Sequence, residues 1–317
     1  MADLRDVNLN RLAVFVAVVE AGSLTAAAER LGLAKTMVSK HMQRLEAEVG
    51  ASLLVRTTRR LNVTEAGRTF YDASCLALRA AEDGLSAIAG EVGPLRGTLR
   101  VNAPIDFGLQ FVAPALVELR RVHPELEVDL QCVDQLVDLV GEGVDVAIRL
   151  GRLADSNYRA VKIGEFVKWM VASPAALGAG AAKPAELAML ADRPYVAVAT
   201  LPRPLSVALE HRDGRKDSLR YPNAFLTNTA TAARAATLAG GGIALLTDFS
   251  IADDVAAGRL VRLLDGWATA PANIHAIFPA TRFPSRKVRA LIDAVKVQWL
   301  AALALRSGKA KRSSSRA

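Results

Sequence analysis

The segment 36–50, TMVSKHMQRLEAEVG, carries polar side chains whose types suit contact with nucleic acid. Lysine and arginine bind phosphates or guanine edges, glutamine binds adenine, and serine or threonine binds either. The acids Glu46 and Glu48 come in its second half, where a helix that enters a DNA groove by its N-terminal end would leave the DNA. On a helical wheel the polar side chains gather on one face, which consists of Thr36, Ser39, Lys40, Gln43 and Arg44.

Groups on both sides of this segment extend the expected contact with DNA. Thr25 is the expected N-cap of a short helix, and the first N–H groups of that helix, at Ala26 and Ala27, would bind a phosphate. The run RTTRR (56–60) would form a basic tip that reaches an adjacent groove or the DNA backbone. Any one basic residue here can also be read as a solvated surface charge, but that reading does not account for the whole set. The predicted DNA-binding residues are Ser23, Thr25, Lys35, Thr36, Met37, Ser39, Lys40, Gln43, Arg44, Arg56, Arg59 and Arg60.

Three helices followed by a two-stranded wing have to position these groups. Apolar residues recur at helical spacing over 9–19, and a second short helix ends at Gly32. The third helix begins at Lys35 or Thr36 and ends at Gly50, and its narrow apolar seam packs against the first two, which makes a helix-turn-helix unit. The seam consists of Val38, Met42, Leu45 and Val49, and the wing strands are expected at 53–55 and 61–63.

A long helix is expected next, because the pattern from Thr64 to Val92 contains no proline and Pro94 follows it. At 1.5 Å per residue this helix spans roughly 42 Å, which is more than a small neighbouring domain can cover. Its apolar stripe is therefore expected to pack against the same helix of a second chain. The predicted dimerisation residues are Phe70, Ala77, Ala81, Leu85 and Ile88.

From Gly97 onward strands alternate with helices, which favours an α/β fold whose sheet is parallel and connected by crossovers. A hairpin is expected at Asp213-Gly214, a dipeptide typical of tight turns between strands. The expected strands are 98–103, 126–131, 144–149, 158–166, 194–200, 224–228, 243–247 and 273–278, and the expected helices are 109–121, 134–140, 229–240 and 285–303.

Composition limits the classes of protein to which the chain can belong. Hydrophobic residues make up 51% of the 317 residues, enough for a large core, and no apolar run predicts a membrane-spanning helix. The N-terminal residues lack the apolar stretch of a signal segment, so a cytoplasmic location is expected. Much of the net charge of +8 lies in residues 306–317, expected to be a basic, disordered tail that is either solubilising or a further contact with DNA phosphates.

The cysteines and histidines predict neither a disulfide nor a cofactor. Cys75 and Cys132 fall in different expected domains and are interpreted as free thiols in a reducing compartment. The four histidines are scattered without the spacing of metal ligands. The sequence contains no nucleophile elbow, phosphate-binding glycine loop or metal cluster, so we expect neither a metal site nor an enzyme.

Several motifs together resemble one family. The run FVAVVEAGSLTAAAERLGLAKTMVSKHMQRLEAEVGASLLVRTTRRLNVTEAG (15–67) closely resembles the N-terminal domain of LysR-type transcriptional regulators. GTLRVNAPIDFG (97–108), VDVAIRLGRLADS (144–156) and LAGGGIALLTDFSIADDVAAGRLVRLL (238–264) are similar to the effector domain of that family. The resemblance extends over residues 8–305. It implies a winged helix-turn-helix, a dimerising linker helix and a two-lobed domain like periplasmic binding proteins, with a small molecule between the lobes and a homotetramer in most members.

The expected domain organisation follows from the pattern and the resemblance together. Two departures from the family are visible: Ala34-Lys35-Thr36-Met37 stands where members commonly have Ser-Gln-Pro, and Thr247 stands where many have proline. Base preference and the local shape of the ligand site are therefore open. The expected domains are the DNA-binding domain at 1–63, the linker helix at 64–93, the effector domain at 97–305 and the tail at 306–317, with lobe one at about 97–165 and 267–305 and lobe two at about 166–266.

Ligands of open α/β sheets bind beyond the carboxyl ends of the strands. By this rule Arg149 would pair with a carboxylate ligand, although a structural bridge to Asp106 or Asp134 explains it equally well. Helix N-termini near Phe107 and Thr229 would also favour an anion, so a small carboxylate or aromatic effector is expected. The predicted effector-binding residues are Ala103, Pro104, Ile105, Asp106, Cys132, Asp134, Arg149, Thr200, Leu201, Asn228 and Thr247.

The expected mechanism is a regulated contact with double-stranded DNA. Two chains paired through 64–92 would place two recognition helices one DNA turn apart, roughly 34 Å. An effector would change the angle between the lobes, and hence DNA bending and contact with RNA polymerase. The sequence leaves open the operator, the effector, activation or repression, and dimer or tetramer.

Three other functions fit this sequence less well. An enzyme on the α/β region lacks a catalytic motif and would show turnover in an activity screen. A solute-binding protein would not carry a helix-turn-helix. A redox-responsive or constitutive regulator of the same family remains an alternative, although an effector domain with Cys132 as its one cysteine cannot form an internal disulfide.

Overall fold

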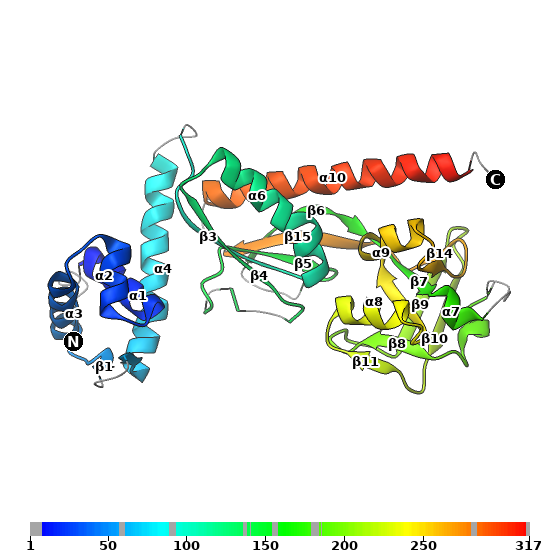
Figure 1. Cartoon of the computed structure of the whole chain (residues 1–317), viewed down its shortest axis with the longest axis horizontal. Helices are drawn as coiled ribbons and strands as arrows, with labels where there is room; N and C mark the ends of the chain where they lie inside the picture. Colours follow the sequence, from blue (N-terminus) through cyan, green and yellow to red (C-terminus); the bar gives the residue numbers. More distant parts are fainter. Residues whose placement is uncertain are drawn as a thin grey trace. The chain divides into compact units, whose positions relative to one another are not determined.

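The computed structural model forms two compact units, Met1–Val92 with Asp138–Gly143 and Gly93–Val137 with Val144–Ala317 (Figure 1). Each unit has a hydrophobic core of its own. Among the residues described, no helix combines the length and the apolar composition that crossing a lipid bilayer requires. The structure describes residues 8–56, 61–88, 93–135, 138–139, 141–153, 158–178, 184, 186–279 and 284–314.

The first unit packs three helices and a two-stranded sheet around one core, which confirms the predicted winged helix-turn-helix. Each helix ends at a glycine with φ of 61°, 63° or 70°, a left-handed conformation that favours glycine. The strands pair antiparallel, with Leu54 opposite Val63 and Arg56 opposite Leu61. The elements are α1 (Leu9–Ala21), α2 (Leu24–Leu31), α3 (Lys35–Val49), β1 (Leu54–Arg56) and β2 (Leu61–Val63).

The long helix α4 (Glu65–Ile88) packs its first turns against α1 of the same chain. The rings of Phe70 and Tyr71 have their centroids 5.8 and 6.4 Å from that of Phe15. Phe70 is therefore partly buried against the core of its own chain, and its predicted place in a dimer contact stays a prediction. The sequence pattern indicated an apolar stripe, but a stripe does not say which partner covers it.

The first lobe of the second unit contains a five-stranded sheet in the order β4-β3-β5-β15-β6. β3 pairs parallel with β4 and β5, whereas β15 pairs antiparallel with β5 and β6. The prediction of a parallel sheet is therefore wrong at this edge, because β15 enters the sheet after the chain has built the second lobe and not through a helical crossover. The strands are β3 (Gly97–Ala103), β4 (Leu126–Cys132), β5 (Val146–Leu150), β6 (Tyr158–Phe166) and β15 (Ala272–Pro279).

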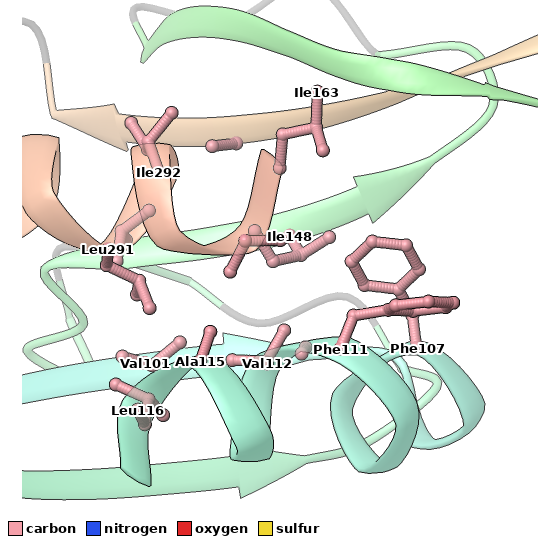
Figure 2. Packing of buried hydrophobic residues seen from close by; sticks show 14 of the residues in the cluster. Val101, Phe107, Phe111, Val112, Ala115, Leu116, Ile148, Ile163, Leu291 and Ile292 are labelled. Atoms are coloured by element: carbon pink, nitrogen blue, oxygen red, sulfur yellow. The ribbon is translucent and has the colours of Figure 1, made fainter. Parts of the chain in front are cut away.

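Helices α6 and α10 lie side by side over one face of this sheet, as Figure 2 shows. Phe111, Ile148 and Leu291 are among the side chains buried between the helices and the strands. Gly164 of β6 lies against Trp299 of α10, where an added Cβ would come within 2.2 Å of the indole Nε1, so this contact requires glycine. The helical elements are α5 (Ile105–Phe107), the π-turn η2 (Gly108–Val112), α6 (Ala113–Val122) and α10 (Arg286–Ser314).

The second lobe contains a five-stranded sheet, β11-β8-β12-β7-β13, and a three-stranded sheet, β10-β9-β14. The predicted hairpin is present and joins β9 to β10, with Gly214 at φ 93°. The strands are β7 (Lys168–Ala172), β8 (Tyr195–Val198), β9 (Ser206–His211), β10 (Lys216–Arg220), β11 (Phe225–Thr227), β12 (Ile243–Thr247), β13 (Val261–Arg262) and β14 (Trp267–Ala268). The helices are α7 (Pro174–Leu177), the 3-10 turn η3 (Leu187–Leu190), α8 (Ala230–Leu238) and α9 (Asp248–Ala256).

Two expectations about helices are wrong. The described residues of 134–140 form bends, turns and irregular backbone, because Asp134 bonds to other elements and does not cap a helix. The closing helix α10 continues to Ser314, so residues 306–314 are helical and not a disordered tail. Alanine, lysine and arginine in this stretch favour helix, and extending an existing helix is easier than nucleating one.

Candidate functional site

Helix α3 of the first unit presents the predicted polar face to solvent. Val38, Met42 and Leu45 are buried against the rest of the core at 0% exposure. This apolar seam fixes the rotation of α3 about its own axis, because turning the polar face inward would expose the apolar side chains to water. Ser39 is half-buried. The exposed members of the face, together with its neighbours, are Lys35, Thr36, Met37, Lys40, Gln43 and Arg44.

The acids of α3 have structural partners that the sequence did not reveal. The Glu46 carboxylate accepts hydrogen bonds from the N–H groups of Leu53 (2.9 Å) and Leu54 (3.1 Å) at the start of the wing. Glu48 forms an ion pair with Arg11 of α1. These contacts fix the orientation of α3 relative to α1 and the wing.

The start of α2 differs from the prediction. Ser23 is the N-cap, and its hydroxyl accepts a hydrogen bond from the Thr25 N–H at 3.2 Å. The Ala27 N–H donates to the Ser23 carbonyl at 3.0 Å. The predicted phosphate site is therefore wrong for Ala27, because the N-cap carbonyl already accepts the first hydrogen bond of the helix. Thr25 is the second residue of the helix and is exposed.

The predicted contacts at the wing tip and along α4 lie partly outside the described residues. β1 ends at Arg56, so the basic tip begins there. On α4, Ala77 is exposed and Ala81 is half-buried. The predicted side chains that fall outside the described ones are those of Arg56, Arg59, Arg60, Leu85 and Ile88.

In the second unit one carboxylate joins the two lobes. Asp134, which follows β4, accepts a hydrogen bond from the Ile105 N–H at the start of α5 (3.0 Å) and from the Ala230 N–H at the start of α8 (3.1 Å). The first of these helices begins before the predicted position near Phe107. Helix N-termini carry partial positive charge, so Asp134 occupies the place where the sequence predicted an anionic ligand.

A second carboxylate adds another bond between the lobes. The Thr231 hydroxyl donates to Oδ1 of Asp106 at 2.6 Å. Burial raises the pKa of Asp106, and the charge of Asp134 raises it further, whereas the hydrogen bond from Thr231 and the charge of Arg234 lower it. Asp106 Oδ2 is buried and has no hydrogen-bond partner among the described residues.

A buried carboxylate on α9 holds α8 in place. Asp254 is 0% exposed and accepts hydrogen bonds from Arg234 Nε of α8 at 2.5 Å and from Arg259 Nη2 at 2.6 Å. The sequence pattern alone did not predict this network. The available signal was the position of Asp254 three residues after Ile251, which places an acid on the buried stripe of α9.

Arg149 lies at the carboxyl end of β5 and is 8% exposed. Its Nη1 donates to Oδ1 of Asn102 at 2.6 Å and to the Ile148 carbonyl at 3.0 Å. A bridge to Asp106 or Asp134 is therefore the wrong structural reading of Arg149, because its side-chain partner is an amide. Sequence reasoning missed Asn102, although a polar residue inside an apolar strand was the signal.

The other predicted effector residues differ in their surroundings. Ala103 is buried at 0% exposure, and the Thr247 hydroxyl donates to Ser250 Oγ at 2.8 Å. Burial raises the pKa of Cys132, and the charge of Asp134 adds to this effect. Within the described part of the chain no group of three or more His, Cys, Asp or Glu side chains could hold a metal ion. Pro104 and Leu201 are half-buried, and Thr200 and Asn228 are exposed.

The structure therefore joins some of the predicted effector residues and leaves others apart. Asp106 and Asp134 accept hydrogen bonds from the N-terminal turn of α8, and Asp134 also accepts one from the Ile105 N–H. Arg149 instead pairs with Asn102. The predicted set thus divides into a carboxylate cluster between the lobes and a cationic group in the sheet of the first lobe.

Known families match both units. Residues 9–68 match the model of the bacterial regulatory helix-turn-helix protein, lysR family, and residues 93–299 match the LysR substrate binding domain. The HTH-type transcriptional regulator PtxR of Pseudomonas aeruginosa is 35% identical over 293 residues, which cover 92% of this chain and 93% of PtxR. The regulator DmlR of Escherichia coli is 33% identical over 290 residues, covering 90% of this chain and 92% of DmlR.

Solved structures are similar over the same extent. The virulence activator AphB of Vibrio cholerae superposes with a TM-score of 0.56 at 27% identity, covering 91% of this chain and 98% of AphB. CrgA of Neisseria meningitidis, a LysR-type transcriptional regulator, gives a TM-score of 0.55 at 27% identity, covering 93% of this chain and 98% of CrgA. The similarity therefore includes both the helix-turn-helix and the two-lobed unit.

Proposed function

Because the chain belongs to the LysR family of transcriptional regulators, we propose that the exposed face of α3 recognises operator DNA and that a small carboxylate or aromatic effector between the lobes controls this recognition. The chain is a DNA-binding transcriptional regulator with an N-terminal helix-turn-helix and an effector-binding domain.

The observation that carries the DNA-binding proposal is the division of α3 into two faces. Three side chains of its seam are completely buried, and Lys40, Gln43 and Arg44 are exposed on the opposite side. Such a face, held rigidly by the rest of the unit, suits insertion into the major groove. We assign base contact to Gln43 and Arg44, and contact with the DNA backbone to Ser23, Thr25 and the basic residues of the wing.

Gln43→Ala and Arg44→Ala should each weaken binding to the operator by about 1–3 kcal/mol, because each removes a side chain that hydrogen-bonds a base edge. Binding to unrelated DNA should change little. The operator can be selected from a random DNA library with the wild-type protein, and affinities measured by fluorescence anisotropy at fixed salt. Arg289→Ala, which removes an exposed charge from the second unit, is the matched control. Wild-type affinity of both α3 variants for the selected DNA would contradict the assignment.

The effector proposal rests on the bonds that join the lobes. Asp134 holds the N-terminal turn of α8 to the start of α5, and Asp106 holds Thr231. A carboxylate of the protein itself thus supplies the negative charge at the α8 N-terminus. An anionic effector that replaces Asp134 there would change the angle between the lobes. A coupling of about 1–3 kcal/mol is enough for a useful switch.

Asp134→Ala should lower the free energy of unfolding of the second unit by about 1–3 kcal/mol, because the N–H groups of Ile105 and Ala230 lose their acceptor. The variant should also lose the effect of the effector on operator affinity. Urea denaturation followed by circular dichroism measures the first change and anisotropy the second. Asp129→Ala removes an exposed acid from β4 and serves as the control. Unchanged stability together with an unchanged effector response would refute the proposed role of Asp134.

Partners and location are further proposals. We place the dimer contact on the linker region 64–93, with Phe70, Ala77, Ala81, Leu85 and Ile88 as its predicted members, and leave dimer or tetramer to sedimentation. Contact with RNA polymerase would transmit the switch to transcription. A regulator has to meet the chromosome, so we propose that it acts in the cytoplasm, and as a regulator we assign it no catalytic activity.

A redox-responsive regulator is the second candidate function, and one observation weighs against it. Reactive cysteines are thiolates, and both burial and the Asp134 charge raise the pKa of Cys132. The thiol form of Cys132 is therefore favoured at neutral pH. Small-molecule control remains the proposed function.

A further inference from the structure

The end of α10 reaches from the first lobe to the second lobe at the hinge between them. The earlier turns of this helix are packed in the core of the first lobe, where Trp299 is 1% exposed. Further along the same helix, Arg306 donates from Nη2 to the Phe249 carbonyl of α9 in the second lobe at 3.3 Å. The guanidinium carbon of Arg306 lies 5.7 Å from the centroid of the Trp299 ring. The first residue of the segment expected to be a tail is therefore a contact between the lobes.

Asp248, the first residue of α9, lies where the chain crosses from one lobe to the other. Its N–H donates to the carbonyl of Val167 at 2.9 Å, and Val167 separates the last residue of β6 from the first residue of β7. The next residue along α9, Phe249, packs in the core of the first lobe. A rotation of the lobes therefore turns about the start of α9, where it shifts side chains by less than at the lobe tips. A contact of hydrogen-bond length at this place can distinguish two lobe angles.

Asp248 and Arg306 each contain a buried atom without a partner. Oδ1 of Asp248 and Nη1 of Arg306 have no hydrogen-bond partner within the described part of the chain. The first atom is an acceptor and the second is a donor, so each can satisfy the other. The two groups also act on each other electrostatically, because burial raises the pKa of Asp248 and the charge of Arg306 opposes that effect. Buried polar atoms that stay unpaired cost free energy, which favours an arrangement that joins them.

A second arginine near Asp248 does not depend on the lobe angle. Burial lowers the pKa of Arg262 of β13, and the charge of Asp248 opposes this effect. Nη2 of Arg262 donates to the Trp267 carbonyl at 2.9 Å, and its guanidinium carbon lies 4.4 Å from the centroid of the Trp169 ring. These residues belong to the second lobe and move with Asp248. Arg306 is instead attached to the first lobe, so its distance from Asp248 changes when the lobes rotate.

We infer that Arg306 and Asp248 form a latch between the lobes, which is open in the present lobe arrangement and closes in a second arrangement rotated about the start of α9. When the latch closes, the guanidinium exchanges its hydrogen bond to the Phe249 carbonyl for the carboxylate of the preceding residue. The closed pair stabilises the second lobe angle. The latch deepens the proposed function, on which its effect on operator binding rests, because it identifies the residues that hold one of two lobe angles.

The distance between the lobes in the full-length protein tests the latch. Nitroxide labels are attached to p-acetylphenylalanine, which is introduced in place of Asp129 of β4 and Lys216 of β10, two exposed residues in different lobes. This chemistry leaves the native cysteines unchanged. Double electron–electron resonance is recorded with an excess of unlabelled protein, so that each distance arises within one chain. Otherwise unchanged protein should show two interlobe distances, one for the open and one for the closed latch.

Variants separate the latch from a merely structural contact. Arg306→Met and Asp248→Asn should each lose the same one of the two distances, because each removes one charge of the pair. A structural role of the hydrogen bond to Phe249 alone would change Arg306→Met and spare Asp248→Asn. Arg306→Lys keeps the charge and should keep both distances, as should the control Arg289→Met, which removes an exposed cation from the same helix.

The inference is overturned if the protein with an intact latch shows a single interlobe distance, or if Asp248→Asn keeps both distances. If Arg306→Met does not fold, Asp248→Asn decides, because it changes a carboxylate to an amide of the same shape.

Operator binding separates the latch from the proposed function. Affinities for the selected operator are measured by fluorescence anisotropy, and each latch variant should differ from wild type by about fivefold or more. Variants that lose one distance but bind the operator like wild type would keep the latch and sink its role in the switch. A wild type whose operator affinity changes with benzoate or lactate, although it shows one interlobe distance throughout, would keep the switch and sink the latch.

Discussion

We expect Phe249→Ala to lower the free energy of unfolding of the second unit by about 3–5 kcal/mol, the range for removing a buried aromatic ring. Phe249 is 2% exposed. Its ring centroid lies 5.6 Å from that of Phe107, 5.9 Å from that of Phe111, 5.8 Å from that of Phe166 and 5.9 Å from that of Trp299. Alanine would leave a cavity among four aromatic neighbours, which cannot collapse without leaving their own packed positions.

The loss should extend to the coupling between the lobes, because Phe249 begins α9 of the second lobe but packs in the core of the first. Phe107 follows directly on Asp106, so the same cluster supports the short helix α5, whose Asp106 contacts α8. Urea denaturation of the full-length protein gives the stability change. Phe225→Ala changes a side chain of β11 that is 60% exposed, so as the control it should lower the free energy of unfolding only slightly. A loss below about 1 kcal/mol for Phe249→Ala would show that the cluster does not hold the lobes together.

The free energy of unfolding of the double variant Arg234→Met with Arg259→Met should be lower by about 3–5 kcal/mol, because the Asp254 carboxylate stays buried without a counter-ion. Asp254 is 0% exposed, whereas both arginines reach solvent with part of their side chains. Each single variant should cost less, since one guanidinium still bonds the carboxylate. Arg220→Met, on an exposed strand residue, is the control. If the double variant were as stable as the control, the two arginines would not be needed to stabilise the buried Asp254 carboxylate.

The pH dependence of this network has a definite sign. Burial alone would raise the pKa of Asp254, but the hydrogen bonds and charges of Arg234 and Arg259 outweigh it, and the pKa is lowered. An acid with a lowered native pKa contributes stability that is complete above its unfolded pKa and is lost as pH falls through the native value. The wild type should therefore keep this contribution until strongly acidic pH. In the double variant burial acts unopposed, so the carboxyl group should take up its proton at a higher pH, which urea midpoints across a pH series would detect.

Local sequence was sufficient wherever a feature depends on one element. The period of α3 determines that Val38 and Met42 face inward and that Gln43 and Arg44 face outward, and the structure has this division. The hairpin at Asp213-Gly214 follows from the backbone conformations open to its own residues. These features require no knowledge of distant parts of the chain.

Tertiary structure decided which partners meet. The apolar stripe of the long helix predicted that Phe70 packs against something, but not that Phe15 of the same chain is one of its contacts. The Asp134 carboxylate bonds the N–H of Ala230, which lies 96 positions further along the chain, and Arg149 bonds Asn102, which lies 47 positions away. Periodicity determines that a side chain is buried, whereas a polar group bonds whichever donor or acceptor the fold brings within about 3 Å. Phe249 shows the same limit, because its helix α9 belongs to the second lobe whereas the core that buries its ring belongs to the first lobe.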